Sequence, residues 1–401
     1  MSSRIRIVLF PCMLLGLVTL ASGQVVRQIT DEKTTVSGPG AMDDGGTAIW
    51  AGTSADFAGE NPDRTFQIVR IDPVTGDATP ITDFADGTAA IVSVSDDGEW
   101  LAFTSPSDLV GNNPDQSLEL FVMRSDGTQT TQLTDDPAPN AGSVGSVALA
   151  GDASRIAFVA NTDPLGTNPD LLDQIFVIDR DGTGLVQLTQ VTSGSIGALT
   201  LSDDGSRIAF GYDGDLVGSN PDLGGEVFVV NADGTDPRQL TVTPDGFSSS
   251  GPALSGDGQR IAFQSDGDLT GGNAIGQTEV FVVDWDGANL RQLTATTGLL
   301  GLTGDPTSQL PSITDDGSWI VYFSNQSTLF PPVNIDGNFE IFRIRNDGSS
   351  RQQLTSTILD GGSVFPIVSG DGSRVTFYGI GVDITIATID GTGGARNDLL
   401  T

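Results

Sequence analysis

The sequence of 401 residues contains no histidine and only one cysteine, Cys12. Histidine is the commonest general base and the commonest ligand of transition metals in proteins. Catalytic sites of the Ser-His-Asp and Cys-His kinds are therefore excluded. Zinc sites built from His and Cys are excluded for the same reason.

Basic residues are scarce, with 18 Lys and Arg against 52 Asp and Glu and a formal net charge of −34. A surface of this charge is a poor partner for nucleic acid or for an anionic membrane. Only seven of the acids are Glu, and Asp, unlike Glu, bonds its own backbone and tolerates turn geometry. Many of these acids are therefore interpreted as turn formers, with adaptation to a saline habitat as a second interpretation.

Long apolar runs are absent except at the N-terminus. Arg4 and Arg6 precede an apolar run from Ile7 to Leu20, and the small residues of Ala21-Ser22-Gly23 follow. This order is typical of a secretory signal peptide, here residues 1–23, and the run is short for a membrane span. We expect a soluble periplasmic or extracellular protein, with residues 24–401 as one domain.

The remaining chain is a series of repeats. The segment SDDGSRIAF at 202–210 recurs in related form, and its final aromatic residue returns at intervals of 52 to 59 residues. Seven units follow one another, and their aromatic residues are Trp50, Phe103, Phe158, Phe210, Phe263, Tyr322 and Phe377.

Each unit also carries an apolar run such as EVFVVNADG at 226–234 and a short run ending in Leu-Thr, such as RQLT at 238–241. The runs are rich in Val, Ile and Phe and are bounded by Asp-Gly, which is typical of strands joined by tight turns. A further strand fits before the first turn, as in GALTLS at 197–202. Four strands in about fifty residues, repeated without interruption, predict an all-β propeller with seven blades of four antiparallel strands.

The repeat resembles the WD-like repeats of TolB-type propellers, in the Ser-x-Asp-Gly turn, the Ile-Ala-Phe strand, the second Asp-Gly and the Arg-Leu-Thr ending. The resemblance covers nearly all of residues 27–401, and a six-bladed TolB-like ring is the alternative that it implies. Such propellers serve as interaction domains, as accessory domains of peptidases and in some cases as lyases, so the repeat says little about function.

The ends of the repeats predict how the ring closes. Residues 27–30 (RQIT) match the last strand of a unit but precede the first unit. We therefore expect this segment to pair with the seventh unit.

Three recurring residue types could carry chemistry. Each unit has one Asp that we assign to the same position of its Ser-x-Asp-Gly turn, and we interpret these residues as turn formers: Asp44, Asp97, Asp152, Asp204, Asp257, Asp316 and Asp371. The recurring arginines, such as Arg155, Arg207, Arg260 and Arg374, are expected to pair locally with Asp. Trp100 and Trp319 are the surface candidates for stacking on sugars, whereas Trp50 occupies the core aromatic position.

The loops of the pattern Asp-x-x-Gly-x-Asn-Pro-Asp are candidate calcium sites, because calcium takes carboxylate, amide and backbone oxygens. In DLVGSNPDLGGE at 215–226 the candidate ligands are Asp215, Asn220, Asp222 and Glu226. A turn without an ion explains the same residues, since Asp caps turns and Asn-Pro initiates them.

Strict repetition argues against an asymmetric catalytic set, and no catalytic residue stands out. We therefore expect a monomeric, non-catalytic module that binds a protein or peptide. The alternative is a carbohydrate- or lactone-active enzyme that uses Asp and Glu as acid and base, with calcium as a possible aid.

Overall fold

The computed structural model describes residues 27–28, 36–54, 63–83, 90–135, 144–295, 307–326, 334, 337–356, 362–380 and 384–390. Every regular element within these ranges is a β-strand. The described part of the chain therefore holds no helix that could cross a membrane. The predicted signal peptide, residues 1–23, lies outside the described residues.

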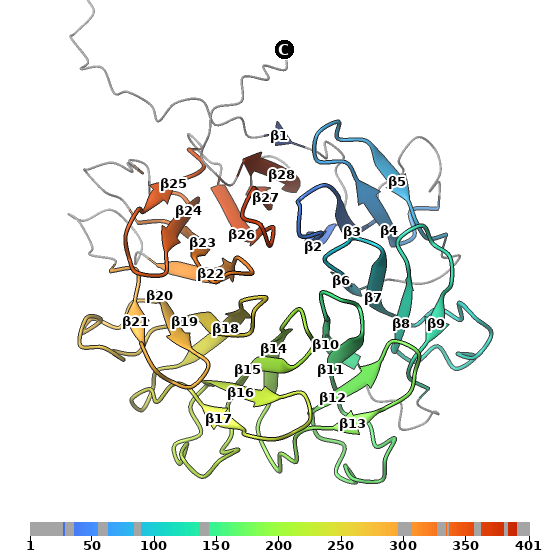
Figure 1. Ribbon diagram of the computed structural model, residues 1–401, viewed down its shortest axis with the longest axis horizontal. Coiled ribbons are helices and arrows are strands. Elements are labelled where there is room, and N and C mark those ends of the chain that lie inside the picture. The colour runs from blue at the N-terminus through green and yellow to red at the C-terminus, as the bar shows by residue number, and fades with distance from the viewer. Residues whose placement is uncertain are drawn as a thin grey trace, which may run out of the picture.

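The strands form seven four-stranded antiparallel sheets arranged around an axis, which confirms the predicted propeller (Figure 1). The first three blades are β2–β5 (Val36–Met42, Ile49–Thr53, Gln67–Ile71, Ala78–Pro80), β6–β9 (Ala90–Val94, Trp100–Ser105, Glu119–Arg124, Thr131–Gln132) and β10–β13 (Val144–Leu149, Arg155–Ala160, Gln174–Asp179, Val186–Gln187). The next three are β14–β17 (Ile196–Leu201, Arg207–Tyr212, Glu226–Asn231, Arg238–Gln239), β18–β21 (Ser249–Leu254, Arg260–Ser265, Glu279–Asp284, Arg291–Gln292) and β22–β25 (Ser308–Ile313, Trp319–Ser324, Glu340–Arg345, Gln352–Gln353). The seventh contains β26–β28 (Gly362–Val368, Arg374–Ile380, Ile384–Asp390).

The ring closes as the repeats predict. Strand β1 (Arg27–Gln28) pairs antiparallel with β28, with Arg27 opposite Thr388, and supplies the outermost strand of the seventh blade. The two ends of the propeller are thereby joined through one sheet. The hydrogen bonds of that sheet hold the first blade beside the seventh.

The recurring aromatic residue is a core residue in every blade. Phe210 lies opposite Phe228 in the register of β15 and β16, and their stacked rings have centroids 5.7 Å apart. Both side chains are fully buried. Equivalent stacked pairs occur in four other blades, so five of the seven blades contain a stacked aromatic pair in their core. Burial on both faces explains why these strands carry apolar residues at successive positions.

The Leu-Thr ending has a structural cause. The Thr241 hydroxyl accepts a hydrogen bond of 2.9 Å from the Val227 amide and donates one to the buried Glu226 carboxylate. Glu226 also accepts two hydrogen bonds of 2.6 Å from Thr243. Threonines at the same position of five other blades accept the equivalent backbone hydrogen bond: Thr82, Thr134, Thr189, Thr294 and Thr355. The motif thus attaches the outermost strand to its blade.

Candidate functional site

The turn after each innermost strand lies near the ring axis. In the fourth blade Asp204 Oδ1 accepts hydrogen bonds from the Ser202 hydroxyl, at 2.7 Å, and from the Ser206 amide, at 2.9 Å. The same carboxylate accepts the equivalent backbone bond in five other blades, at Asp97, Asp152, Asp257, Asp316 and Asp371. These six acids shape their turns, as the sequence predicted.

The seventh member of that predicted row, Asp44, was assigned wrongly. In the first blade Asp43 takes the place that Ser or Thr has in five of the other blades and Ala150 has in the third, because the Gly46 amide bonds its carbonyl as Gly98 bonds Ser95. Asp44 therefore occupies the position before the turn-forming carboxylate. The residues at this position around the ring are Asp44, Asp96, Gly151, Asp203, Gly256, Asp315 and Gly370.

We call Asp44, Asp96, Asp203 and Asp315 the acidic girdle. The sequence interpretation missed it, although one signal was available, because only Asp or Gly occurs at this position. The structure shows why the two alternate. A Cβ atom at Gly256 would overlap with the Asp203 carboxylate, and one at Gly151 would overlap with the Asp96 carboxylate. Each glycine makes room for the acid of the preceding blade.

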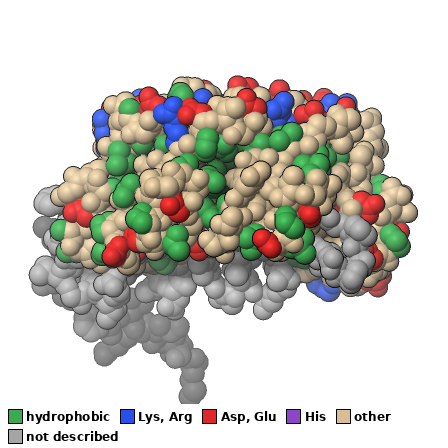
Figure 2. All heavy atoms as spheres, turned by 90° about the horizontal axis from the view of Figure 1, so that it is seen from below, with side chains coloured by type: hydrophobic (Ala, Val, Ile, Leu, Met, Phe, Trp, Pro, Cys, Tyr) green, Lys and Arg blue, Asp and Glu red, His purple; other side chains and the backbone are tan. Residues whose placement is uncertain are grey.

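Backbone hydrogen bonds connect the seven turns into a closed ring. The Asp44 amide bonds the Asp96 carbonyl at 3.1 Å, and the Asp315 amide bonds the Gly370 carbonyl at 3.1 Å. In the remaining five bonds the amides of residues 96, 152, 203, 257 and 371 donate to the carbonyls of residues 151, 203, 256, 315 and 44, respectively, at 2.9 to 3.3 Å. The girdle is thus held on a rigid scaffold. Figure 2 shows that most of the Lys and Arg side chains visible from this side lie along one rim of the ring, together with Asp and Glu.

Three of the girdle acids, Asp96, Asp203 and Asp315, have raised pKa values. Partial burial, followed by the charges of Asp44, Asp97 and Asp152, raises the pKa of Asp96 to about 6. Partial burial and then the charge of Asp96 raise the pKa of Asp203 to about 7. The same burial, the charge of Asp203 and a hydrogen bond to Asp44 raise the pKa of Asp315 to about 8.

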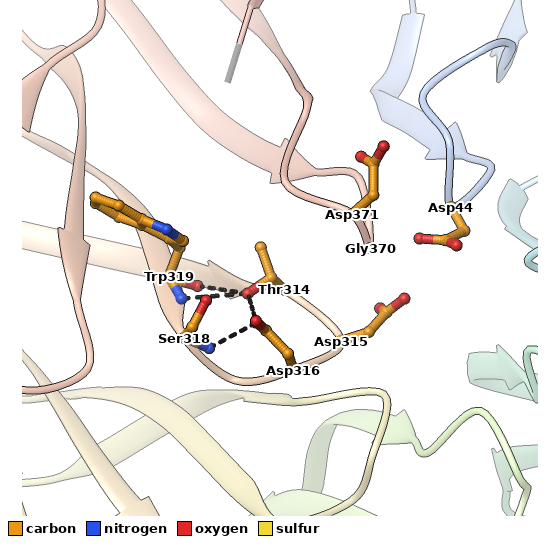
Figure 3. Close-up of a pocket in the computed structure, with 8 residues that line it drawn as sticks. All are labelled: Asp44, Thr314, Asp315, Asp316, Ser318, Trp319, Gly370 and Asp371. Atoms are coloured by element: carbon orange, nitrogen blue, oxygen red, sulfur yellow. Dashed lines mark hydrogen bonds between the residues drawn. The ribbon is translucent and has the colours of Figure 1, made fainter. Parts of the chain in front are cut away.

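Asp315 and Asp44 form a carboxyl pair at the seventh blade. A Cβ atom at Gly370 would overlap with both Asp315 Oδ2 and Asp44 Oδ1, so the two oxygens lie against the same point. Asp44 Oδ1 is buried and has no hydrogen-bond partner in the described structure. Because Asp315 Oδ2 is the acidic oxygen beside it, we call the two residues the dyad. Figure 3 shows both carboxyl groups facing a pocket of about 390 Å³ that Thr314, Asp316 and Asp371 also line.

This charge arrangement predicts a pH dependence of stability. An acid whose pKa is higher in the folded than in the unfolded chain binds its proton longer when folded, so the free energy of unfolding falls as pH rises from about 4 to about 8. We expect Asp315→Asn to gain about 1–2 kcal/mol at pH 8.5, after allowance for solvent screening, and nothing at pH 4. Thermal melts at both pH values measure this. The exposed Asp222→Asn serves as control, and an equal gain at pH 4 would contradict the assignment.

The other predicted candidates have structural partners. Arg207 and Arg260 each donate to a backbone carbonyl of the next blade's turn, at Gly258 and Gly317. Arg260 also pairs with Asp284 at 3.3 Å, the local pairing that the sequence predicted. The guanidinium groups of Arg343 and Arg345 lie over the Trp319 ring, 4.4 and 4.7 Å from its centroid.

Trp100 has the same environment, with Arg180 at 4.1 Å and Arg124 at 5.0 Å from the ring centroid. Both indoles are therefore already occupied by cations. In Figure 3 the Trp319 ring lies on the far side of the pocket from Asp44. The dyad, and not these indoles, is the asymmetric feature of this face.

The long loops lie between the second and third strands of their blades and are closed by their own residues. The Asn220 amide hydrogen bonds to Asp215 Oδ1 at 3.0 Å. The Asn220 side chain is buried and donates to the carbonyls of Gly214 and Gly224, at 3.1 and 2.8 Å. Asn113, Asn168 and Asn273 close their loops in the same way, whereas the loop of the first unit lies mostly outside the described residues.

Glu226 does not join Asp215, because its carboxylate is bonded to Thr241 and Thr243. In the described ranges no group of three or more acidic side chains is placed to hold a metal ion. The turn explanation therefore accounts for these loops, including the DLVGSNPDLGGE segment.

The two explanations of the loops differ in a measurable way. We expect Asn220→Ala to lower the free energy of unfolding by about 2 kcal/mol, because two buried carbonyls lose their donor. A chelator is expected to leave the melting temperature of the unaltered protein unchanged. Denaturant unfolding and calorimetry test both, with Asp222→Ala as the control at an exposed ligand candidate. A rise in melting temperature on adding calcium would restore the ion hypothesis.

Comparison with known proteins identifies neither a matching family model nor a similar curated sequence. Solved structures do match. An oligogalacturonate lyase in complex with manganese superposes with a TM-score of 0.61 at 15% identity, over 91% of this chain and 92% of the other. A puromycin hydrolase superposes with a TM-score of 0.60 at 13% identity, over 92% of this chain and 55% of the other. A putative TolB from Agrobacterium tumefaciens reaches only 0.44.

These matches support the β-propeller fold, and the expected function requires correction. We expected a non-catalytic binding module, but the matching structures with TM-scores above 0.5 described above are enzymes. The chain spans about half of the puromycin hydrolase and nearly all of the lyase. At these identities the likeness itself establishes the fold alone, so a catalytic role must be argued from the site.

Proposed function

We propose that this protein is an acid–base enzyme that hydrolyses an uncharged lactone at the Asp315–Asp44 dyad. The observation that carries the proposal is the dyad itself, in which two carboxyl groups meet over Gly370 and the pKa of Asp315 is raised to about 8. A carboxylic acid that keeps its proton at neutral pH can donate it during a reaction. Its partner can accept a proton at the same time.

The closeness of the two groups favours the lactone over a glycoside. Pairs of carboxylates that cleave glycosidic bonds stand about 5 to 9.5 Å apart, because a sugar or a water lies between them. Asp315 Oδ2 and Asp44 Oδ1 lie 2.0 and 2.2 Å from the position that a Cβ atom of Gly370 would take, so the two oxygens are closer than that, and we propose that the pair shares one proton. Two carboxyl groups that share one proton are arranged to activate a single water and polarise one carbonyl.

The proposed reaction uses one water. The ionised carboxylate takes a proton from the water as its oxygen attacks the lactone carbonyl carbon, and the protonated carboxyl gives its proton to the carbonyl oxygen. Collapse of the tetrahedral intermediate breaks the ring C–O bond. The carboxyl that gained the proton of water gives it to the released ring oxygen, and the other carboxylate takes back a proton from the hydroxyl of the intermediate as the carbonyl reforms. The products are a hydroxyl group and a carboxylic acid, and both side chains return to their starting states. General acid–base steps of this kind contribute about 10²- to 10⁴-fold in rate.

The charge of the site defines the substrate further. The pocket is lined by Asp44, Asp315, Asp316 and Asp371, and the lining residues include no Lys or Arg. An anionic substrate such as a uronate would be repelled at this face. A neutral ring is accommodated, and the carboxylate formed by hydrolysis is driven out by the same charge.

Several sequence-based expectations form part of the proposal. We propose that the protein acts as a monomer after export, in the periplasm or outside the cell, and that it neither binds nucleic acid nor inserts into a membrane. Calcium assistance is not part of this proposal, and the chelator experiment described above tests it for the loops. The dyad mechanism requires no metal.

A substrate screen tests the function. The purified protein is incubated with neutral lactones, neutral glycosides and oligouronates, and products are followed by proton release, by reducing ends and by absorbance of unsaturated products. We expect proton release from lactones alone. Turnover of glycosides or uronates without lactones would overturn the proposal, as would inactivity towards all three classes.

A further inference from the structure

The innermost strands form the wall that borders the ring axis, and each contains a register irregularity near its middle. We call these strands the inner wall. In the third, fourth and fifth blades the irregularity holds small residues or proline, but in the sixth and seventh it holds bulky apolar ones. The residues are Gly145-Ser146, Gly197-Ala198, Gly251-Pro252, Leu310-Pro311 and Phe365-Pro366.

The bulky residues are held in a strained backbone. Leu310 has φ 45° and Phe365 has φ 54°. At the equivalent position of the fifth blade the left-handed conformation is taken by a glycine, Gly251, at φ 60°. Left-handed φ values are unfavourable for bulky side chains and natural for glycine. Strain of this kind concentrates at functional sites. The sixth and seventh blades therefore retain large apolar side chains where glycine would fit with less strain.

Burial in the core does not explain why a large apolar side chain is present at position 365. Its side chain touches Phe323 and Tyr378, with ring centroids 5.8 and 6.1 Å away, yet the residue is 45% exposed. Leu310 reaches back along the inner wall to Gly251 of the fifth blade and is partly buried. An exposed aromatic ring that packs against two others presents a rigid apolar surface on the inner wall.

This surface lies on the strands that lead to the dyad. Strand β22 runs into the turn of Asp315, and β26 runs into the turn of Gly370, where the two carboxyl groups meet. Phe365 precedes Gly370 by five residues, which corresponds to about 16 Å along an extended strand. The acid pair and the apolar surface thus belong to the same two blades, one at the rim and one further along the wall.

We propose that Phe365 and Leu310 form an apolar subsite that binds the hydrocarbon substituent of a neutral lactone whose carbonyl lies at the dyad. This proposal rests on the proposed lactone hydrolysis and names its substrate class. A lactone with an apolar chain of about 16 Å would place its ring at the dyad and the end of its chain at Phe365 and Leu310. Burial of each further CH₂ group strengthens binding, so chain length should govern the preference among lactones.

The test combines catalysis with a binding measurement that needs no turnover. We expect kcat/KM to rise at least tenfold from a methyl-substituted to a dodecyl-substituted lactone, and this rise to vanish in Phe365→Gly. The fluorescence of the neutral probe N-phenyl-1-naphthylamine reports binding directly, and its affinity should fall at least tenfold in the same variant. Glycine suits the positive φ, and Phe365→Asn, which tolerates it too, provides a second folded variant.

The controls separate this inference from the function on which it rests. Leu165→Ala removes a side chain that is equally exposed, at 45%, on a long loop of the third blade, and it should change neither affinity nor chain-length preference. Probe binding that depends on Phe365 without lactone turnover supports the subsite and overturns the reaction. Turnover without chain-length preference, or equal probe affinity in wild type and Phe365→Gly, overturns the subsite.

Discussion

Asp315→Asn is expected to lower kcat for lactone hydrolysis by about 10²- to 10⁴-fold while changing KM little, because it removes a proton donor and keeps the shape of the side chain. Asn preserves a hydrogen-bond donor towards Asp44, so the turn and the pocket should remain intact. Steady-state kinetics at pH 6 to 7 measure the effect. Retention of more than a tenth of wild-type kcat would exclude Asp315 as the acid.

The pH profile distinguishes a catalytic acid from a structural one. In the wild-type protein kcat should decline above about pH 8, because Asp315 then loses the proton that it donates. Since the charge of Asp203 contributes to that raised pKa, Asp203→Asn should move the alkaline decline to lower pH. An unmoved decline would show that another group titrates.

A turn acid of the fifth blade serves as the matched control. Asp257 forms the same hydrogen bonds within its turn as Asp316 does, but its neighbour in the girdle position is Gly256 and not an acid. Asp257→Asn should weaken the turn and leave kcat and its pH profile unchanged. A large loss of kcat in this variant would mean that any disturbance of the ring abolishes activity.

Deleting residues 24–32 is expected to lower the melting temperature by more than 10 °C. The deletion removes β1, the strand that completes the seventh blade by pairing with β28. The edge of β28 is then exposed, and the seventh blade loses the connection that closes the ring, at a cost of about 3–5 kcal/mol from lost hydrogen bonds and packing. Differential scanning calorimetry measures the loss.

Two further samples identify the cause of that loss. The double variant Arg27→Ala, Gln28→Ala keeps the backbone and therefore the strand pairing, so it should melt within a few degrees of wild type. A synthetic peptide of residues 24–32 added to the deleted protein should restore part of the lost stability. An unchanged melting temperature on deletion would show that β1 does not close the ring.

Local sequence determined the blade and its repetition. The Asp-Gly turns, the Ile-Ala-Phe strand and the Leu-Thr ending recur because every blade makes the same local bonds, such as Ser202 and Ser206 to Asp204. The same reasoning identified the core aromatic position and predicted the pairing with the last unit that the structure shows for Arg27 and Gln28. Because each blade makes the same local interactions, the same residue types recur at the same spacing along the sequence, and this periodicity can be recognised without a structure.

Only the tertiary structure decided where the chemistry lies. Asp44 and Asp315 are 271 residues apart in the sequence, and they meet because ring closure places the first blade beside the seventh. The repeat hid this pair, since a shift of one residue in the first unit placed Asp44 among the turn formers. Proton sharing and raised pKa values depend on burial and on distances across blades, which no local pattern encodes. The sequence by itself therefore determined the propeller, and the closed ring decided which of its many carboxylates face one another.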